Sequence, residues 1–369
     1  MLQTTPRKIP RTSRKNLIRV LICDDSAFLR VTLRRIIESD PQMRVVDFAR
    51  NGAEAVDKAV RLRPDVITMD IHMPLVDGVT ALKDIVYLKL APVIMLAATT
   101  SEDAAAAIEA MEAGAFDFIA KPSNVDHLDH HASAIIQKIK QASMANIYGK
   151  STVPEPADYT IGERQIPIAP LTPLPRFGYK AVALGLSTGG PKAIFEVLPL
   201  LPANLNAAVF VVQHMPAAFL TTFTERLGQR TKLPCVQSDA GMVIESGHIY
   251  VARGGYHLKL LRKNSGEVVI RQTKEPQHLF MPSVDITMSS VCDVFGVDTI
   301  GVLMTGMGWD GAEGMLKIAT AGGMTIAESE ETAVVFGMPK EAIKRGAAKQ
   351  ILPNPKIAAE ITKAAGTRS

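Results

Sequence analysis

Cysteine is scarce in this sequence, and no long hydrophobic run is present. The 369 residues include three cysteines, Cys23, Cys235 and Cys292, which are odd in number and far apart. We therefore expect reduced core thiols, with neither a disulfide framework nor a zinc site. No apolar run reaches the roughly 18 residues that suggest a membrane span, and the basic N-terminus lacks the apolar segment of a secretory signal. These absences predict a cytoplasmic protein that is not inserted in a membrane.

The sequence also lacks a large excess of positive or negative charge. The formal net charge is +4, and five basic residues fall within residues 1–18, which we expect to form a disordered, solvated arm. So small a charge, concentrated in such an arm, does not predict a nucleic-acid partner. Hydrophobic residues make up 47% of the sequence and charged residues 21%, as is usual for a globular protein. The length suffices for two domains, each with a sizeable core.

Strand and helix patterns alternate from residue 19 to residue 143. Short runs rich in β-branched residues are separated by apolar residues at helical spacing, which predicts a parallel sheet with helices on both faces. We expect an α/β domain with a doubly wound, five-stranded parallel sheet. The clearest strand signals cover residues 20–23, 66–69, 93–96 and 118–120.

A proline-bearing linker over residues 144–179 precedes a second domain at 180–369. Six prolines interrupt the linker, which predicts an extended, semi-stiff connection that serves either as a passive tether or as a docking segment. The second domain is again expected to be α/β, with a mixed, mainly parallel sheet. Antiparallel pairing is expected in the hairpin-like stretch at 249–270. Strand signals cover residues 181–184, 208–212, 249–252, 258–261 and 300–304.

Acidic residues stand where strands of the first domain end. Asp24 and Asp25 close the first strand, Asp70 closes the third, and Lys121 follows the fifth. Parallel sheets bind ligands beyond the carboxyl ends of their strands, so these three carboxylates are expected to converge. They would repel one another without a hard cation, and Mg²⁺ prefers such a set of carboxylates together with water and phosphate. The pattern therefore predicts a Mg²⁺ site.

This first domain resembles a response-regulator receiver domain, which is a flavodoxin-like fold. The matching motifs are Asp24-Asp25, Asp70-Ile71-His72-Met73-Pro74, Asp77-Gly78 and Lys121-Pro122. The resemblance implies that Asp70 accepts a phosphoryl group from a histidine kinase. It also implies that Asp25, Asp70 and the backbone carbonyl of His72 hold Mg²⁺, with Asp24 nearby.

The same resemblance pairs Lys121 with the acyl phosphate and places Phe118 at the switch-aromatic position of the family. One position departs from the pattern, because Ala97 stands where the family has Ser or Thr at the end of the fourth strand. Its methyl group cannot donate a hydrogen bond to a phosphoryl oxygen, and neither Thr99 nor Thr100 matches the position by register. We therefore expect phosphorylation with a weaker or altered conformational response.

A glycine-rich hexapeptide, Gly185-Leu186-Ser187-Thr188-Gly189-Gly190, lies between the first strand and the first helix of the second domain. Such a turn lifts a serine to the carboxyl edge of a sheet, which is how a G-x-S-x-G elbow presents a nucleophile. The hydroxyl of Ser187 would still need a base to take its proton. Glycine-rich turns between a strand and a helix bind phosphate at least as often, so the hexapeptide alone leaves both interpretations open.

Two further strand ends carry candidates for a catalytic triad. His214 is the candidate base, because an unperturbed imidazole has a pKa of about 6.5. Asp310, in a glycine-rich loop, would orient that imidazole, and Asp285 is the rival acid. Each residue also has a structural interpretation, since a lone histidine is commonly a core residue and Asp310 could cap the next helix. The coincidence of Ser187, His214 and Asp310 at separate strand ends favours the triad.

Backbone amides near these residues are candidates for an oxyanion hole. Glycines lie close to Ser187 in the sequence and on both sides of Met307, which leaves the N–H groups of Thr188 and Met307 accessible. The chain order Ser, His, Asp differs from the Ser, Asp, His order of α/β-hydrolases, so we expect a convergent triad on another fold.

The second domain resembles the methylesterase domain of the CheB family over residues 180–353. The matching motifs are the Gly185–Gly190 hexapeptide, Gln213-His214-Met215-Pro216, Pro282-Ser283-Val284-Asp285, Thr305-Gly306-Met307-Gly308-Trp309-Asp310-Gly311-Ala312 and Gly337-Met338-Pro339. The basic side chains usual before Pro282 are replaced by Phe280 and Met281, which removes positive charge from the expected docking site of an acidic receptor helix.

The resemblance implies a phosphorylation-activated protein-glutamate methylesterase that acts on methyl-accepting chemotaxis receptors, often with glutamine deamidase activity. It assigns the triad roles to Ser187, His214 and Asp310, with no cofactor for the esterase reaction. The alternative is a non-catalytic receiver–effector scaffold in which the glycine-rich hexapeptide binds phosphate.

Overall fold

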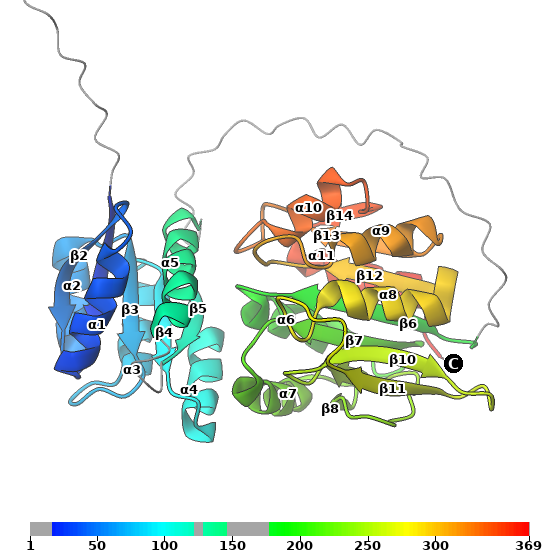
Figure 1. Ribbon diagram of the computed structural model, residues 1–369. Coiled ribbons are helices and arrows are strands. Elements are labelled where there is room, and N and C mark those ends of the chain that lie inside the picture. Colours follow the sequence, from blue (N-terminus) through cyan, green and yellow to red (C-terminus); the bar gives the residue numbers. More distant parts are fainter. Residues whose placement is uncertain (1–16, 122–127, 146–176, 369) are drawn as a thin grey trace, which may run out of the picture.

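The described residues of the computed structural model, 17–121, 128–145 and 177–368, form two α/β domains that lie side by side (Figure 1). Most of the expected basic arm (1–16) and most of the expected linker (146–176) lie outside the described residues.

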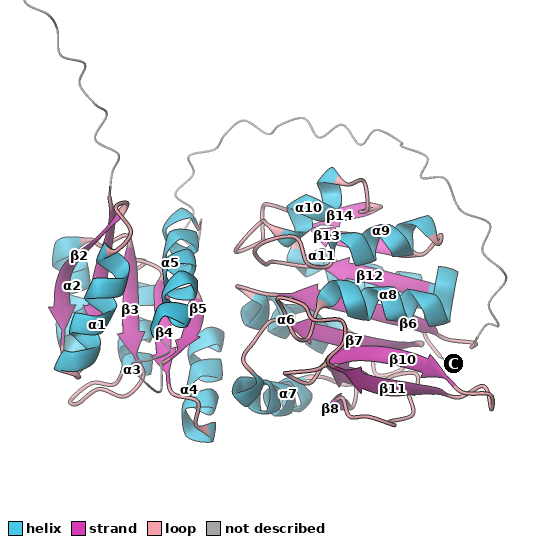
Figure 2. Cartoon of the chain, in the orientation of Figure 1, coloured by secondary structure: helices cyan, strands magenta, loops and turns pink. Residues whose placement is uncertain are grey.

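The N-terminal domain contains a five-stranded parallel sheet within its described residues. Its elements are β1 (Ile18–Cys23), α1 (Ala27–Glu38), β2 (Met43–Ala49), α2 (Gly52–Leu62), β3 (Val66–Asp70), α3 (Gly78–Tyr87), β4 (Val93–Ala97), α4 (Ser101–Glu112), β5 (Asp117–Ala120) and α5 (Leu128–Met144). The strand order is β2-β1-β3-β4-β5. Helices α1 and α5 pack over strand residues such as Ile22 and Ile94, and α2, α3 and α4 pack over residues such as Met69 and Met95 (Figure 2). The expected doubly wound fold is confirmed.

The C-terminal domain contains a seven-stranded sheet within its described residues, and every neighbouring pair of strands in it is parallel. Its elements are β6 (Lys180–Leu186), α6 (Gly190–Val197), η2 (Leu198–Leu200), β7 (Ala207–Gln213), α7 (Ala217–Arg230), β8 (Cys235–Gln237), β9 (Ile249–Val251), β10 (His257–Arg262), β11 (Val268–Thr273), α8 (Val284–Phe295), η3 (Gly296–Asp298), β12 (Thr299–Leu303), α9 (Ala312–Thr320), β13 (Met324–Glu328), α10 (Met338–Lys344), β14 (Gln350–Leu352) and α11 (Asn354–Ala365). The strand order β14-β13-β12-β6-β7-β9-β8 makes β12, β6 and β7 consecutive neighbours.

The antiparallel part of this domain is smaller than the sequence predicts. Strands β10 and β11 form an antiparallel hairpin that is separate from the large sheet, which confirms a mainly parallel domain with one antiparallel component. Strand β9 does not belong to this hairpin, so the expectation that antiparallel pairing begins at Ile249 is wrong. All three residues of β9 are buried, as suits a parallel strand that is covered on both faces, whereas β10 has partly exposed positions.

Contacts between the two domains include α4 and β5 on one side and α6 and α7 on the other. Helix α4 packs against α7 and α6. The ring of Phe118, on β5, lies 4.5 Å from that of Phe219, on α7, between ring centroids. The carboxylate of Glu112, at the end of α4, accepts hydrogen bonds from Arg226 at 3.2 Å and from Arg230 at 2.9 Å. Aromatic packing and a charge cluster therefore hold this face of the N-terminal domain against the C-terminal domain.

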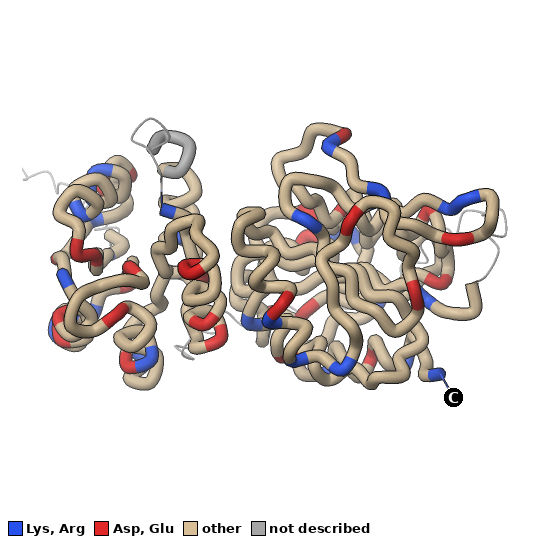
Figure 3. The backbone as a smooth tube through the Cα atoms, turned by 90° about the horizontal axis from the view of Figure 1, so that it is seen from below, with Lys and Arg blue, Asp and Glu red and all other residues tan. Residues whose placement is uncertain are grey.

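Charged residues of both signs are interspersed on both domains (Figure 3). In the part of the chain that the structure describes, no helix combines the length and the apolar character needed to cross a lipid bilayer.

We expect truncation of Phe210 to destabilise the C-terminal domain strongly. Phe210 is fully buried in β7 and stacks on Tyr250, so Phe210→Ala leaves a cavity that should cost about 3–5 kcal/mol of unfolding free energy. Urea unfolding followed by the fluorescence of Trp309, the one tryptophan of the sequence, reports on this domain.

Leu261→Ala is the control for this prediction. Leu261, on β10, is 48% exposed, so its truncation should change the unfolding free energy by about 0.5 kcal/mol or less. Equal unfolding midpoints for the two variants would contradict the prediction.

Candidate active site

The glycine-rich turn places Ser187 directly after β6. Strand β6 ends at Leu186 and α6 begins at Gly190, with Pro191 in its first turn. Gly189 has φ of 78°, and a Cβ there would lie 2.5 Å from Val334, so this position requires glycine. The turn therefore presents Ser187 at the carboxyl edge of the sheet, as the sequence predicts.

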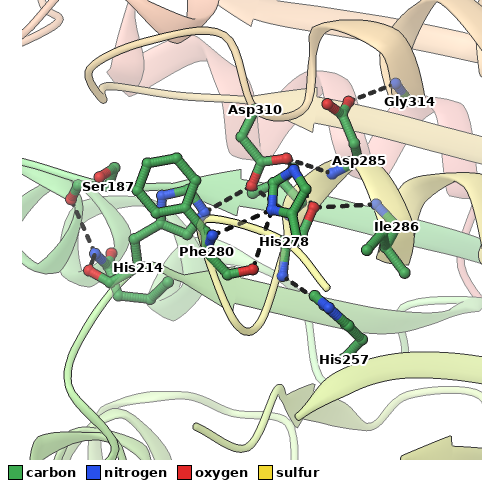
Figure 4. A network of polar contacts seen from close by, with 12 residues as sticks. Ser187, His214, His257, His278, Phe280, Asp285, Ile286, Asp310 and Gly314 are labelled. Carbon is green, nitrogen blue, oxygen red and sulfur yellow. Dashed lines mark hydrogen bonds and ion pairs between the residues drawn. The ribbon is translucent and has the colours of Figure 1, made fainter. Parts of the chain in front are cut away.

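Parallel pairing brings His214 to the same edge. Leu186 at the end of β6 pairs with Gln213 at the end of β7, and the N–H of His214 donates to the carbonyl of Leu186 at 3.0 Å. The side-chain amide of Gln213 donates to the carbonyl of Ser187 at 2.9 Å. Because the strands are in register, Ser187 and His214 follow them at neighbouring positions (Figure 4).

The imidazole of His214 binds Asp310 and is covered by an aromatic ring. Its Nε2 lies 2.8 Å from Oδ2 of Asp310, and its side chain is 7% exposed. The ring of Phe280 stacks on it, with centroids 4.1 Å apart and planes 9° apart. Phe280 therefore shields one face of the imidazole from water.

Asp310 is a buried carboxylate that four donors surround. Besides His214, it accepts hydrogen bonds from the hydroxyl of Ser283 at 2.8 Å, the N–H of Val284 at 2.8 Å and the N–H of Asp285 at 3.0 Å. Burial favours the neutral carboxyl, but the hydrogen bond and charge of His214, together with the backbone donors, hold the pKa of Asp310 at about 2. Asp310 is therefore anionic and able to orient the imidazole.

Asp285, the rival acid, has a different role in the fold. Its Oδ1 accepts a hydrogen bond from the N–H of Gly314, in the first turn of α9, at 2.7 Å. Burial raises the pKa of Asp285 to about 6, partly offset by the Gly314 N–H, and the charge of Asp310 raises it further. The structural interpretation of Asp310 as a cap is wrong, because Gly311 is the N-cap of α9 and Asp285, not Asp310, accepts the hydrogen bond from the first turn of that helix.

The geometry leaves one nitrogen of His214 free for the serine. Its Nδ1 is buried and has no hydrogen-bond partner in the described residues, and no hydrogen bond joins it to the Ser187 hydroxyl. Because Nε2 faces Asp310, Nδ1 is the nitrogen that can take a proton from Ser187. Nucleophile–base hydrogen bonds are often long without substrate and tighten when it binds.

The two amides predicted to form an oxyanion hole are free of internal partners. Within the described residues, neither the N–H of Thr188 nor that of Met307 donates a hydrogen bond. The loop that carries Met307 lies against the serine, because a Cβ on Gly306 would be 2.8 Å from the Cβ of Ser187. Their role stays a prediction.

The acidic residues of the N-terminal domain converge as expected. Ligand oxygens of Asp24, Asp25 and Asp70 lie within 4.8 Å of one another. The ammonium of Lys121 is 2.6 Å from Oδ1 of Asp70 and 3.9 Å from Oδ2 of Asp24. Burial and then the charge of Asp70 raise the pKa of Asp24 to about 6, and its Oδ2 is buried without a hydrogen-bond partner. A divalent cation with oxygen ligands, such as Mg²⁺, fits this donor set.

The side chain of His72 points away from the acidic cluster. It is 57% exposed, and its Nε2 lies 3.0 Å from Oδ1 of Asp103. The hydroxyl of Thr100 also bonds Asp103, at 3.2 Å, while Ala97 is buried and offers no hydroxyl. Phe118 is 5% exposed and packs against the C-terminal domain, as described above.

Two residues that contact His214 or Asp310 could not be identified from the sequence. Phe280 was recognised only as a replacement for a basic residue, and its stacking on His214 depends on how the loop before α8 folds. Ser283 belongs to a recognised motif, but a serine that precedes a helix predicts an N-cap rather than a hydrogen bond to Asp310. The Ser283 hydroxyl does both, because it also accepts from the N–H of Ile286.

Both domains match known protein families. Residues 20–133 match the response regulator receiver domain and residues 182–361 match the CheB methylesterase domain. A protein-glutamate methylesterase/protein-glutamine glutaminase of Syntrophomonas wolfei is 48% identical over 355 residues, which cover 94% of this chain and 99% of that protein. One from Thermotoga maritima is 41% identical over 345 residues, covering 92% and 96%. The crystal structure of the CheB methylesterase catalytic domain from Thermotoga maritima has 38% identity and a TM-score of 0.49, covering 50% of this chain and 98% of that one.

We expect Asp25→Asn to weaken Mg²⁺ binding to the full chain. Removing one of the three charges that face the cation should raise the dissociation constant by about 10-fold, or roughly 1.4 kcal/mol. Isothermal titration calorimetry with MgCl₂ measures this change. Asp57→Asn is the control, because Asp57 is an exposed residue of α2 outside the cluster. An unchanged dissociation constant for Asp25→Asn would contradict the assignment.

Proposed function

The chain belongs to the family of protein-glutamate methylesterase/protein-glutamine glutaminases, and we propose that it demethylates methyl-accepting chemotaxis receptors through Ser187, His214 and Asp310. The protein is a hydrolase with an N-terminal receiver domain. The substrate, the triad and the control by phosphorylation are parts of the proposal.

The observation that carries this proposal is the environment of His214. Asp310 occupies Nε2 at 2.8 Å, and the buried Nδ1 has no partner in the described residues. A histidine with one nitrogen fixed by a carboxylate and the other free beside a serine is suited to general base catalysis. In the serine-protease template the roles of the two nitrogens are reversed, but the chemistry requires only one donor and one acceptor.

The reaction follows from this arrangement. Nδ1 of His214 takes the proton of Ser187 as the Oγ attacks the carbonyl carbon of a glutamyl methyl ester. The tetrahedral intermediate collapses when His214 returns the proton to the methoxy oxygen, which releases methanol and leaves an acyl-enzyme. Water, deprotonated by the same imidazole, then attacks the acyl carbon and frees glutamate and Ser187. Asp310 stabilises the imidazolium formed in each step.

The amides of Thr188 and Met307 are suited to the oxyanion of each tetrahedral intermediate. Both are free of internal acceptors, and both belong to loops that meet at Ser187. The same chemistry applies to a glutamine side chain, with ammonia in place of methanol, so a deamidase activity needs no further residue.

We propose that phosphorylation of Asp70 controls access to this site. A histidine kinase would supply the phosphoryl group, and the acidic cluster would hold the Mg²⁺ that neutralises charge during transfer. The receiver lies near the catalytic loops, because Gln141 of α5 contacts the sulfur of Met307. A phosphorylation that favours an undocked arrangement would therefore uncover the substrate cleft.

We expect Ser187→Ala to lower kcat for methanol release by about 10⁴-fold, because the nucleophile is lost. Methylated receptor membranes are the substrate, and a fluorophosphonate probe should label wild-type Ser187 but not the variant. Ser283→Ala serves as a comparison, because it removes one donor to Asp310 and keeps the nucleophile. Activity in Ser187→Ala equal to wild type, or unlabelled wild-type Ser187, would favour the phosphate-binding alternative.

We expect Glu112→Arg to activate the unphosphorylated chain. The substitution places like charge against Arg226 and Arg230 and should weaken docking by about 1–2 kcal/mol, which raises the undocked population by a factor of about 5–30. Methanol release without an acyl-phosphate donor measures this change.

Two variants control the docking prediction. Glu109→Arg alters the same helix but breaks a pair with Lys83 inside the receiver, so basal activity should stay near wild type. Adding Arg226→Glu and Arg230→Glu to Glu112→Arg restores opposite charges and should restore low basal activity. Basal activity that is the same in Glu112→Arg and wild type would argue against occlusion.

A further inference from the structure

Glu328 is a buried carboxylate that the roles described so far leave unexplained. It ends β13, beside β12, and has no exposed surface. No cationic side chain pairs with Glu328 in the described part of the chain. Burial, which outweighs its hydrogen bonds, raises the pKa of Glu328 to about 7. The charged group that raises its pKa electrostatically is another acid, Glu196 on α6. An acidic side chain without a cation is costly to bury, so its hydrogen bonds must serve a purpose in this fold.

Both side-chain oxygens of Glu328 accept hydrogen bonds from loops of the C-terminal domain. Oε2 accepts from the N–H of Thr305 at 2.8 Å, and Oε1 accepts from the hydroxyl of Thr332 at 2.9 Å. Thr305 follows β12 and opens the loop that carries Met307 and Asp310. Glu328 therefore binds Thr305 near the start of the loop that supplies the proposed triad acid and one candidate oxyanion donor.

Thr305 in turn holds the nucleophile turn. Its carbonyl accepts from the N–H of Ser187 at 3.0 Å, and its hydroxyl donates to the carbonyl of Thr188 at 2.9 Å. The same hydroxyl accepts from the N–H of Val335 at 2.9 Å. The remaining polar group of Thr305, its N–H, is the one that Glu328 binds. Through this single residue, the carboxylate is two hydrogen bonds from the backbone of the nucleophile.

We propose that Glu328 is a positioning residue for the esterase reaction, which fixes Thr305 so that the Ser187 turn and the loop after β12 meet in a productive geometry. This inference rests on the proposed function. Glu328 touches neither substrate nor reacting atoms, and it acts through hydrogen bonds alone. Misplacement of a catalytic group by about 1 Å can cost about 10²-fold in rate, so the expected effect is on kcat.

The test compares Glu328→Leu, Glu328→Gln and Glu328→Asp in the full chain. Leucine removes both acceptors and should lower kcat by about 10²-fold, with KM within about 2-fold of wild type. Glutamine keeps an acceptor for the Thr305 N–H and offers its amide to the Thr332 oxygen, so kcat should stay within about 3-fold of wild type. Aspartate is one methylene shorter, cannot reach both partners, and should lower kcat by about 10-fold.

Two measurements separate positioning from folding. Methanol release from methylated receptor membranes gives kcat and KM, and the fluorophosphonate labelling rate at Ser187 gives the reactivity of the nucleophile without receptor. Thermal unfolding followed by Trp309 fluorescence shows whether each variant is folded, and Glu328→Asp keeps the test valid if Glu328→Leu does not fold. Glu196→Leu is the matched control, because Glu196 bonds Asn354 rather than Thr305, and its kcat should be unchanged.

The outcomes are distinct. Loss of kcat and of labelling rate in Glu328→Leu and Glu328→Asp supports the proposal, provided that Glu328→Gln retains both and Glu196→Leu has no effect. A lowered melting temperature with wild-type kcat in Glu328→Leu, or equal losses of kcat in Glu328→Gln and Glu328→Leu, overturns it. Ser187→Ala is assayed beside them, and activity in that variant would overturn the proposed function whatever Glu328 does.

Discussion

The candidate site depends on keeping the carboxylate of Asp310 charged inside the protein. Burial alone would neutralise it, but the first turn of α8 directs the N–H groups of Val284 and Asp285 at it, and the hydroxyl of Ser283 adds a third donor. His214 completes the set. Because α8 and the loop after β12 must meet for these bonds to form, the geometry of the proposed triad is a product of the fold rather than of any one loop.

The α/β architecture could be predicted from the sequence because parallel strands are buried on both faces and appear as continuous apolar runs. The same logic places Ser187 and His214 together, since residues that follow neighbouring parallel strands share one edge. It fails at Ile249, where a short buried strand and the hairpin that follows have similar composition. Which strands pair with each other depends on contacts between residues distant in sequence, and the local sequence pattern carries no information on those contacts.

Within the site, residue types were predictable and supporting contacts were not. Asp310 and Asp285 both stand near glycines or small residues, and only the folded structure shows His214 bonded to Asp310 while Asp285 binds the first turn of α9. The sequence did not indicate a role for Glu328, since an acidic residue at a strand end is ordinarily exposed to solvent. Its burial follows from strand order, which sets β13 next to β12.

Helix α4 connects the loop after β4, which follows the neighbour of the strand that ends at Asp70, with the domain contact. Asp103 in its first turn binds the loop after β4, and Glu112 at its last residue binds α7, about 14 Å along the axis. Thermodynamic linkage makes any such connection reciprocal. If a phosphoryl group on Asp70 disfavours docking by a given factor, docking disfavours the phosphorylated state by the same factor. The catalytic domain then regulates its own receiver, and binding of substrate to the open form would raise the equilibrium population of the phosphorylated state.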